Sequence, residues 1–233
     1  LLNSSTGRTI MAVREDENSL LVGARSLDEC ARDRYAWDRA QILEDCLDAW
    51  RLKPLARRIV ELTSQYVVGG GLVVRCGHAP TQAFINTFWQ APLNRMDVRL
   101  VEMCDELTRT GNLFLLLSMD QAGMSYLRVV PASQINTIDA AENDIEQPLR
   151  FICKPEGIGE VRVFQAYRSG MDGPDQDGRF PAVMLHYAVN KPAGGQWGEP
   201  DLAPMLRWLA RYAAWLEDRV RLNRFRNAFL YVV

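Results

Sequence analysis

The chain has 233 residues, 48% of them hydrophobic, and a formal net charge of -2. This length allows one large domain or two small ones with a sizeable core, and the apolar content is ordinary for a globular protein. The near-neutral charge excludes a nucleic-acid binder that is basic along its whole length, so any contact with nucleic acid must be local. No apolar run approaches the roughly 20 residues that span a bilayer, and we expect a soluble, non-secreted protein without membrane contact.

The N-terminal region divides into an arm and a helix. Residues 1–26 are rich in Ser, Thr, Asn and charged side chains, which predicts an arm that is either disordered or tied onto a neighbour. From about Leu27 the pattern becomes helical, and one apolar stripe indicates a buried face. This stripe comprises Leu43, Cys46, Leu47 and Trp50.

Pro54 separates this helix from the next one. Proline disfavours helical geometry in the residue before it but suits the first position of a new helix. The new helix is predicted over Leu55–Val68 and ends at Gly69–Gly71, because successive glycines cost too much backbone entropy. Leu72–Val74 is expected to form a short strand. The predicted buried face of the helix comprises Leu55, Ile59, Leu62 and Tyr66.

Two further helices precede the main strands. A short one is expected over Pro80–Trp89, capped by Thr81, and a longer one over Asp97–Thr110, closed by Gly111. Apolar side chains recur at helical spacing in the longer helix and are expected to face inward. They are Leu100, Met103, Cys104 and Leu107.

The period then changes to that of strands. Residues 112–119 and 125–130 flank a turn at 120–123 and predict a hairpin. Its first strand is continuously apolar, so both of its faces should be covered. Together with the helices, these strands indicate an α+β fold. Further strands are expected at Ile135–Asp139, Leu149–Lys154, Glu160–Tyr167 and Ala182–Tyr187.

A long helix is predicted over residues 199–228, with acids and prolines at its start and arginines at its end, as the helix dipole favours. A helix apolar over so much of its circumference is buried on more than one side, by preceding residues or by other chains. One apolar line comprises Leu202, Met205, Leu206, Leu209, Ala213, Leu216 and Val220. A second comprises Trp208, Tyr212, Trp215 and Leu222.

Arginines mark both the polar strip and the end of this helix. Those near its end either complement the dipole and interact with water, or contact a polyanion, and the sequence leaves both open. The strip contains Arg207, Arg211, Asp218 and Arg221, and the end contains Arg219, Arg221, Arg224 and Arg226.

Motifs for catalysis and cofactor binding are missing from the sequence. The Gly69–Gly71 run follows a helix, whereas a phosphate-binding loop needs glycines between a strand and a helix. His78 and His186 lie far apart, and His186 is expected to be a hydrogen-bonded structural residue in a strand. The five cysteines have no C-x-x-C spacing and are expected to be buried reduced thiols. We predict no catalytic, cofactor-binding or metal-ligating residues, and no enzyme.

The order of these pieces resembles the portal proteins of tailed bacteriophages, the head-to-tail connectors, over roughly Leu43–Val233. The pieces that carry the resemblance are the helix Pro54–Thr63 leading to Gly69–Gly71, the helix Leu100–Leu107 running into Thr110-Gly-Asn-Leu-Phe-Leu115, the hairpin reaching Leu127–Ile135, the strand Met184–Tyr187, a Gly-rich loop, Gly198–Pro204 and the long helix.

The resemblance implies a portal-like wing of helices packed on a mostly antiparallel sheet over residues 27–198. Residues 199–228 would be the first stem helix and 229–233 the start of a clip region, the remainder of which is absent. It further implies a homo-oligomeric ring, typically dodecameric, at one capsid vertex of the virion, assembled in the host cytoplasm. Double-stranded DNA would be packaged and ejected through it. The implied partners are the terminase large subunit, capsid and scaffold proteins, and tail connector proteins.

On this resemblance the second apolar line of the long helix would contact neighbouring subunits. The subunit-interface residues would be Leu206, Leu209, Trp208, Tyr212, Trp215 and Leu216. Electrostatic contacts with DNA or at the junction of stem and clip would involve Arg207, Arg211, Arg219, Arg221, Arg224 and Arg226. The alternative is another phage head-assembly or scaffold interaction protein without a DNA channel. A third class, an enzyme, would require a bound metal or nucleotide.

Overall fold

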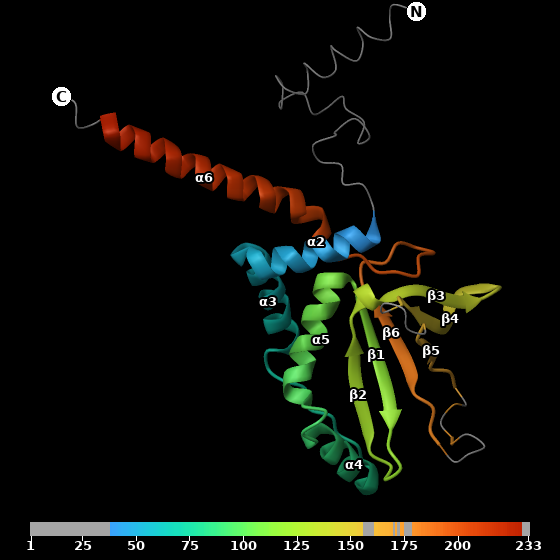
Figure 1. The fold of residues 1–233 in the computed structure, drawn as a ribbon. Helices are drawn as coiled ribbons and strands as arrows, with labels where there is room; N and C mark the ends of the chain where they lie inside the picture. The colour runs from blue at the N-terminus through green and yellow to red at the C-terminus, as the bar shows by residue number, and fades with distance from the viewer. Residues whose placement is uncertain (1–37, 156–160, 170, 172, 175–178, 230–233) are drawn as a thin grey trace, which may run out of the picture. The chain divides into compact units, whose positions relative to one another are not determined.

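The structure is a computed structural model that describes residues 38–155, 161–169, 171, 173–174 and 179–229 (Figure 1). Contacts within the chain divide it into residues 1–38 and 39–233, and the fold below is that of the second unit. The predicted arm, residues 1–26, lies outside the described residues, as do 230–233 of the predicted clip segment.

The described unit has the α+β composition that the sequence predicts. The helices are α2 (Arg39–Leu52), α3 (Pro54–Val68), α4 (Ala79–Gln90), α5 (Met96–Thr110) and α6 (Leu206–Phe229). The strands are β1 (Asn112–Met119), β2 (Ser125–Val130), β3 (Ile135–Ala141), β4 (Asp144–Cys153), β5 (Val163–Ala166) and β6 (Val183–Ala188). Short 3-10 helices occupy Ala132–Gln134 and Ala203–Met205.

The strands form one six-stranded sheet in the order β2-β1-β6-β5-β4-β3. Every pairing is antiparallel except that of β5 with β6, which confirms the mostly antiparallel sheet. The expected β1–β2 hairpin forms with Phe114 opposite Val130. On its other side β1 pairs with β6, which places Phe114 opposite His186.

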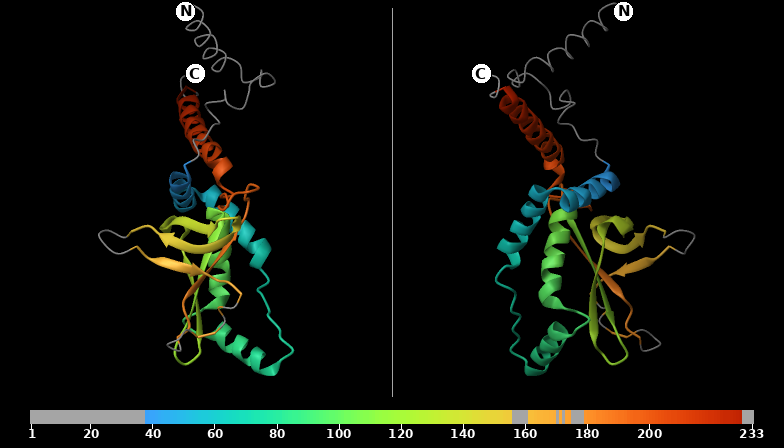
Figure 2. Two further views of the ribbon diagram at one scale, coloured as in Figure 1. Left: turned by 90° about the vertical axis from the view of Figure 1, so that its right-hand side faces the viewer. Right: turned by 60° about the vertical axis from the view of Figure 1, so that its left-hand side comes forward.

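Strand β1 lies at the centre of the core, and both of its faces are covered as predicted. Phe114 belongs to a buried cluster with Phe151 of β4 and Leu43 of α2. Leu113 and Leu115 point to the other face, where side chains of α4 and α5 pack against them. Figure 2 shows α5 running along this side of the hairpin. The stripe predicted for α2 is buried at Leu43 and Cys46 and half-buried at Leu47 and Trp50.

The buried face predicted for α3 is confirmed only in part, since Ile59 and Leu62 are half-buried. Tyr66 is 87% exposed and Leu55 is 46% exposed, whereas Ala56, Val60 and Ser64 are buried. Small side chains allow α3 to approach α5 closely, and the hydroxyl of Ser64 donates a hydrogen bond to Asp105 of α5. Two of the four side chains of the predicted face, Leu55 and Tyr66, are therefore exposed.

Two local expectations between α3 and α5 are also wrong. Leu72–Val74 forms no strand and pairs with none of the six strands of the described residues. A side chain of α4 holds this segment instead, because the Cys76 backbone N–H donates to Gln82 Oε1 at 2.6 Å and Gln82 Nε2 donates to the Val74 carbonyl at 3.3 Å. The N-cap of α4 is His78, and Thr81 lies inside the helix. The side chains expected to face inward from α5 are half-buried, at Leu100, Met103, Cys104 and Leu107.

Helix α6 begins at Leu206 instead of Glu199. The Glu199 N–H donates to the Val189 carbonyl at 3.1 Å, and the Asp201 N–H donates to the Thr108 carbonyl at 3.1 Å. These bonds tie the Glu199–Asp201 segment to Val189 and to the end of α5, and the acids and prolines form the lead-in to α6.

The prediction of buried cysteines is confirmed at Cys46 and Cys153, whereas Cys76 and Cys104 are half-buried. Cys30 lies outside the described residues. None of the helices in the described part of the chain is both long and apolar enough to cross a bilayer.

Candidate functional site

The lead-in to α6 lies across the corner where α5 ends and β1 begins. Gly111 closes α5 with a φ of 72°, a left-handed conformation that favours glycine. A Cβ at Gly111 would lie 2.4–2.5 Å from the backbone of Glu199, and one at Gly198 would lie 2.0 Å from the Gly111 carbonyl oxygen. Two glycines therefore allow these distant segments to cross in direct backbone contact.

Asn112, only 1% exposed, joins the two segments with its side-chain amide. Its Nδ2 donates to the carbonyls of Thr110 at 2.8 Å and Gly198 at 2.9 Å. Its Oδ1 accepts from the Gly198 N–H at 2.9 Å and lies 3.1 Å from His186 Nε2. Both donors and both acceptor positions of this buried amide are therefore used, which fixes the position of the α6 lead-in on the sheet.

His186 has the hydrogen-bonded structural role that the sequence predicts. Because Asn112 Oδ1 is an acceptor, the Nε2 of the neutral ring carries the proton and donates it. The ring stacks on Phe114 with a centroid distance of 4.3 Å. Burial, and secondarily the charge of Lys191, lower the pKa of His186 to about 4, so the ring is neutral at pH 7.

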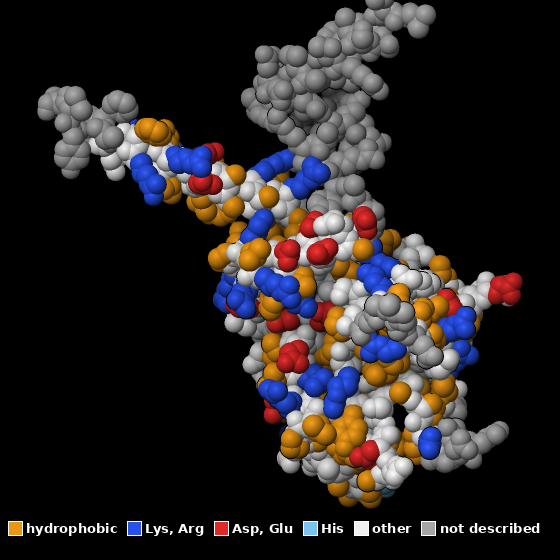
Figure 3. All heavy atoms as spheres, in the orientation of Figure 1, with side chains coloured by type: hydrophobic (Ala, Val, Ile, Leu, Met, Phe, Trp, Pro, Cys, Tyr) orange, Lys and Arg blue, Asp and Glu red, His pale blue; other side chains and the backbone are white. Residues whose placement is uncertain are grey.

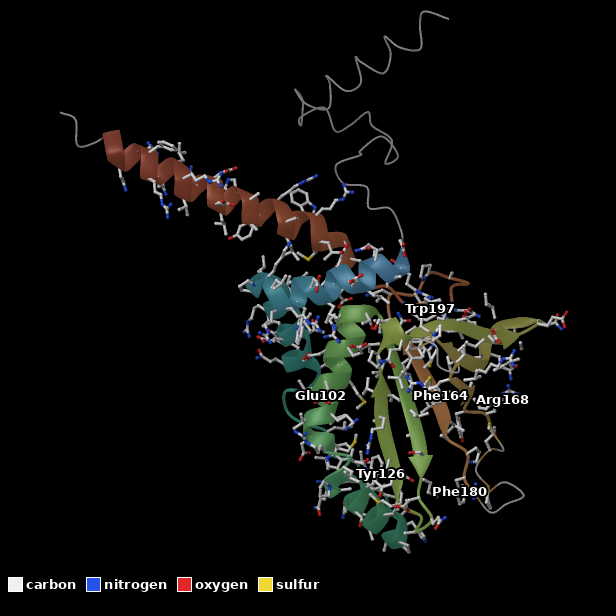
Figure 4. The ribbon with its side chains drawn as sticks, viewed as in Figure 1. Glu102, Tyr126, Phe164, Arg168, Phe180 and Trp197 are labelled. Carbon is white, nitrogen blue, oxygen red and sulfur yellow. The ribbon has the colours of Figure 1, made fainter. Side chains whose placement is uncertain are left out.

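Trp197, labelled in Figure 4, extends this aromatic cluster just before the lead-in. Its ring lies 5.6 Å from Phe114 and 6.2 Å from His186, measured between centroids. On its other side the guanidinium of Arg39 lies 3.5 Å from the ring centroid. The loop before α6 is therefore attached to the sheet and to the start of α2.

The root of α6 is buried within the chain, but the rest of the helix is not. Leu202, Leu206 and Leu209 are 0%, 8% and 4% exposed, respectively. From Tyr212 to Asn227 every residue is exposed. Of the six residues that the sequence assigns to a subunit interface, Leu206 and Leu209 are thus packed inside their own chain. The other four are surface residues, with Trp208 61%, Tyr212 49%, Trp215 55% and Leu216 42% exposed.

The two predicted apolar lines lie side by side along the exposed part of α6. Ala213, Leu216 and Val220 continue the line of the buried root, and Leu216 and Val220 are 42% and 49% exposed. At about 100° per residue the two lines together cover about 200° of the helix circumference. Tyr212 and Trp215 stack within the second line at a centroid distance of 6.0 Å. The second line comprises Trp208, Tyr212, Trp215 and Leu222.

The arginines of α6 do not form a single stripe. Arg211 and Arg219 lie over the rings of Trp208 and Trp215, at 5.3 Å and 6.0 Å from the respective centroids. Arg221 forms an exposed ion pair with Glu217. Basic side chains appear at several places along α6 in Figure 3. The remaining predicted positions are the half-buried Arg207 and the exposed Arg224 and Arg226.

Several hollows lie elsewhere on the described surface. An open groove of about 430 Å³ lies between α3, α5 and Gly69–Val73, with the carboxylates of Glu61, Asp97 and Asp105 at its wall. No group of three or more His, Cys, Asp or Glu side chains in the described residues could hold a metal ion. We take the exposed apolar surface of α6 as the candidate functional site.

Asn112 and Gly198 were not identified as structural determinants from the sequence. Both lie in segments that contribute to the resemblance, Thr110–Leu115 and Gly198–Pro204, but a hydrogen bond across 86 positions of sequence leaves no local pattern. A buried asparagine at the start of an otherwise apolar strand is the one available signal, because such an amide requires partners.

Comparison with known proteins finds chains of similar fold but no match in sequence. No protein-family model matches the chain, and no curated protein matches it. A chain from the neck of a native gene transfer agent (GTA) particle, computed with C12 symmetry, has a TM-score of 0.56 and 14% identity, covering 94% of this chain and 51% of that one. A chain from the neck of an empty GTA particle, computed with C6 symmetry, has a TM-score of 0.50 and 16% identity, covering 86% and 48%. This chain thus spans about half the length of the chains it matches, and the likeness is one of fold.

Proposed function

We propose that this chain is part of a portal protein, a ring-forming subunit at the head–tail vertex of a tailed-phage particle. In this proposal the described residues before α6 form the wing, and α6 is the first stem helix. Double-stranded DNA is packaged and ejected through the ring. The partners are the terminase large subunit, capsid and scaffold proteins, and tail connector proteins, and the ring belongs to the virion.

The exposed apolar surface of α6 is the observation that carries this proposal. A helix with Trp208, Trp215 and Leu216 in water is unfavourable, because burying one large apolar side chain contributes about 1.5–3 kcal/mol. The two apolar lines differ in composition and occupy adjacent sectors of the same helix. That arrangement suits a heterologous contact, in which one line of each subunit meets the other line of the next, and such contacts close into rings.

The fold likeness supports the same assembly. The two neck structures were computed with C12 and C6 symmetry, which are the symmetries of rings. A dodecamer is compatible with both, since a C12 ring also has C6 symmetry. The proposal thus combines the exposed apolar surface of α6 with a fold found in chains of necks that were computed with cyclic symmetry.

The proposed role as a DNA conduit leads to a separate prediction about two arginines near the end of α6. Reversing the charge of Arg219 and Arg221 to Glu should disturb assembly or DNA packaging more than folding of the wing, because both residues are exposed and far from the core. The measurements are ring formation and protection of packaged DNA from nuclease. Unchanged assembly together with unchanged packaging would argue against any role for these arginines.

Electron microscopy of the complete gene product tests the ring directly. We expect particles with a central channel, and a strictly monomeric protein would refute the proposal. The variant Trp215→Ser/Leu216→Ser should remove about 2 kcal/mol per subunit contact, about a 30-fold weakening at each contact of the ring. Its matched control is Asp218→Ser, an exposed position in the same turn of α6 but on the polar strip.

Thermal unfolding separates an assembly defect from a folding defect. Trp215 and Leu216 are exposed in the single subunit, so their replacement should leave the wing's melting temperature close to that of the control. Rings that form equally well with both variants would contradict the assignment of α6 to the subunit interface. Oligomers without a central channel would instead favour a head-assembly or scaffold protein of another kind.

A further inference from the structure

The hairpin between β3 and β4 has an acidic tip. Residues 139–146 contain four acidic side chains and no basic one. Asp139 and Glu146 already have partners, in Arg150 at 2.6 Å and Lys191 at 3.3 Å. Glu142 and Asp144 are exposed at the tip, next to Ile145, an apolar side chain that is 50% exposed. The tip therefore combines net negative charge with one apolar side chain that is half exposed.

The corner between α2 and α3 has the opposite charge. Residues 50–61 contain four basic side chains, Arg51, Lys53, Arg57 and Arg58, and one acidic side chain, Glu61. Glu61 lies 3.7 Å from each of Arg57 and Arg58 and cannot neutralise all four. Leu52, 78% exposed, and Leu55, 46% exposed, lie among these charges. The corner therefore combines net positive charge with apolar surface.

Aromatic stacking holds part of this basic corner in place. The guanidinium groups of Arg57 and Arg109 each lie 5.0 Å from the ring centroid of Trp50. Arg109 is paired with Glu106, a buried carboxylate, so the stack is attached to α5. A guanidinium that is already oriented loses less side-chain freedom when it meets a carboxylate.

The acidic tip and the basic corner lie on opposite sides of the described unit. Helix α3 packs outside α5, and α5 in turn packs on β1, whereas β3 is the edge strand beyond β4 at the other end of the sheet. Figure 1 shows α3 and the β3–β4 hairpin at opposite sides, and Figure 3 shows acidic side chains at the hairpin tip and basic ones over the α2–α3 corner. The two surfaces cannot meet within one copy.

We infer that the acidic tip of one copy docks against the basic α2–α3 corner of the next copy, as a second contact around the ring. The inference rests on the proposed function, because head-to-tail contacts of this kind close only in a ring. Opposite charges select the neighbour and set the register, while Ile145 meets the apolar surface of Leu52 and Leu55. The contact is made by the wing and is separate from the α6 surface.

A charge-swap experiment on the complete gene product tests this contact. A tip variant carries Glu142→Lys and Asp144→Lys, and a corner variant carries Arg51→Glu and Arg58→Glu. Each variant alone should assemble about tenfold less well than the parent at low salt, because like charges then face each other. The control is Glu102→Lys, a charge reversal at an exposed position of α5 outside both surfaces, labelled in Figure 4.

Mixing the two variants should restore rings. The lysine tip of one variant then faces the glutamate corner of the other, and the acidic tip of the second faces the basic corner of the first. An alternating ring closes with any even number of subunits. Rescue by mixing also proves that both variants are folded, since misfolded proteins would not complement each other.

The possible results separate this inference from the proposed function. Rings from the parent protein with no loss in either variant would overturn the inference and leave the proposed function standing. Loss in both variants without rescue on mixing would also overturn it. A parent protein that never forms rings would overturn the proposed function and this inference together.

Discussion

Replacing Asn112 with alanine should loosen the joint that holds α6 on the sheet. The substitution removes hydrogen bonds to the Thr110 carbonyl, the Gly198 carbonyl and N–H, and His186. Because Asn112 is 1% exposed, water cannot easily replace them. At about 1 kcal/mol for each hydrogen bond, the free energy of unfolding should fall by about 4 kcal/mol. This is a large part of the total stability of a typical domain.

Urea unfolding followed by circular dichroism measures this loss. The matched control is Asn143→Ala in the exposed β3–β4 turn, which should change the unfolding free energy by less than about 0.5 kcal/mol. Hydrogen exchange should locate the effect, with faster exchange at the amides of Glu199 and Asp201, which bond to Val189 and Thr108. A loss below about 1 kcal/mol, or faster exchange spread evenly over the sheet, would refute the assignment of Asn112 as the joint.

Three further predictions concern the same part of the fold and its core. The pKa of His186 is lowered to about 4 in the folded protein, against about 6.5 in the unfolded chain, so the unfolded chain binds the proton first as the pH falls. The contribution of neutral His186 to the free energy of unfolding is therefore complete above pH 6.5, and about 3 kcal/mol of it is lost as the pH falls to 4. Urea unfolding at several pH values should show a smaller loss in His186→Phe. Gly198→Ala should destabilise the protein by about 3 kcal/mol or more, because the added Cβ would lie 2.0 Å from a backbone oxygen. The control is Gly70→Ala, whose Cβ would meet nothing within 4 Å. Equal melting temperatures of the two variants would contradict the crossing geometry. Burial raises the pKa of the Cys46 thiol to about 12, so iodoacetamide at pH 8 should leave Cys46 unmodified in the folded protein and modify it in urea. Labelling of Cys46 in the folded protein as fast as that of Cys76 would contradict its burial.

The periodic patterns of the sequence predicted the elements better than the faces they bury. The strands β1 and β2 and the ends of α5 follow from apolar runs, turn residues and Gly111, which act locally. The burial of Ala56 and Ser64 on α3 does not follow from a local pattern, because it requires a partner helix that comes close enough to exclude larger side chains. The parallel pairing of β5 with β6 likewise depends on the path of the whole chain.

The candidate site was predictable in part for the same reason. The two apolar lines of α6 are visible in the sequence because helical geometry alone places Trp208, Tyr212 and Trp215 together. Where α6 begins was not predictable, since the Glu199–Asp201 backbone bonds to residues that are distant in sequence. Which part of the first line is buried inside the chain was not predictable either. Leu206 and Leu216 have the same character in the sequence, and only the fold places one against the subunit and the other at the surface.

The contrast between the fixed root of α6 and its exposed length suits a ring subunit. A long helix that met its neighbours while free to swing would lose that freedom on assembly, at a cost in affinity. Here the crossing of Gly111 and Gly198, the amide of Asn112 and the buried Leu202 and Leu206 orient the root before any neighbour binds. Weakening the root should therefore weaken assembly even though these residues are buried within their own subunit. Asn112→Ala should reduce ring formation while leaving the exposed Trp208 and Trp215 unchanged, and a ring of parental stability built from this variant would show that neighbours alone orient α6.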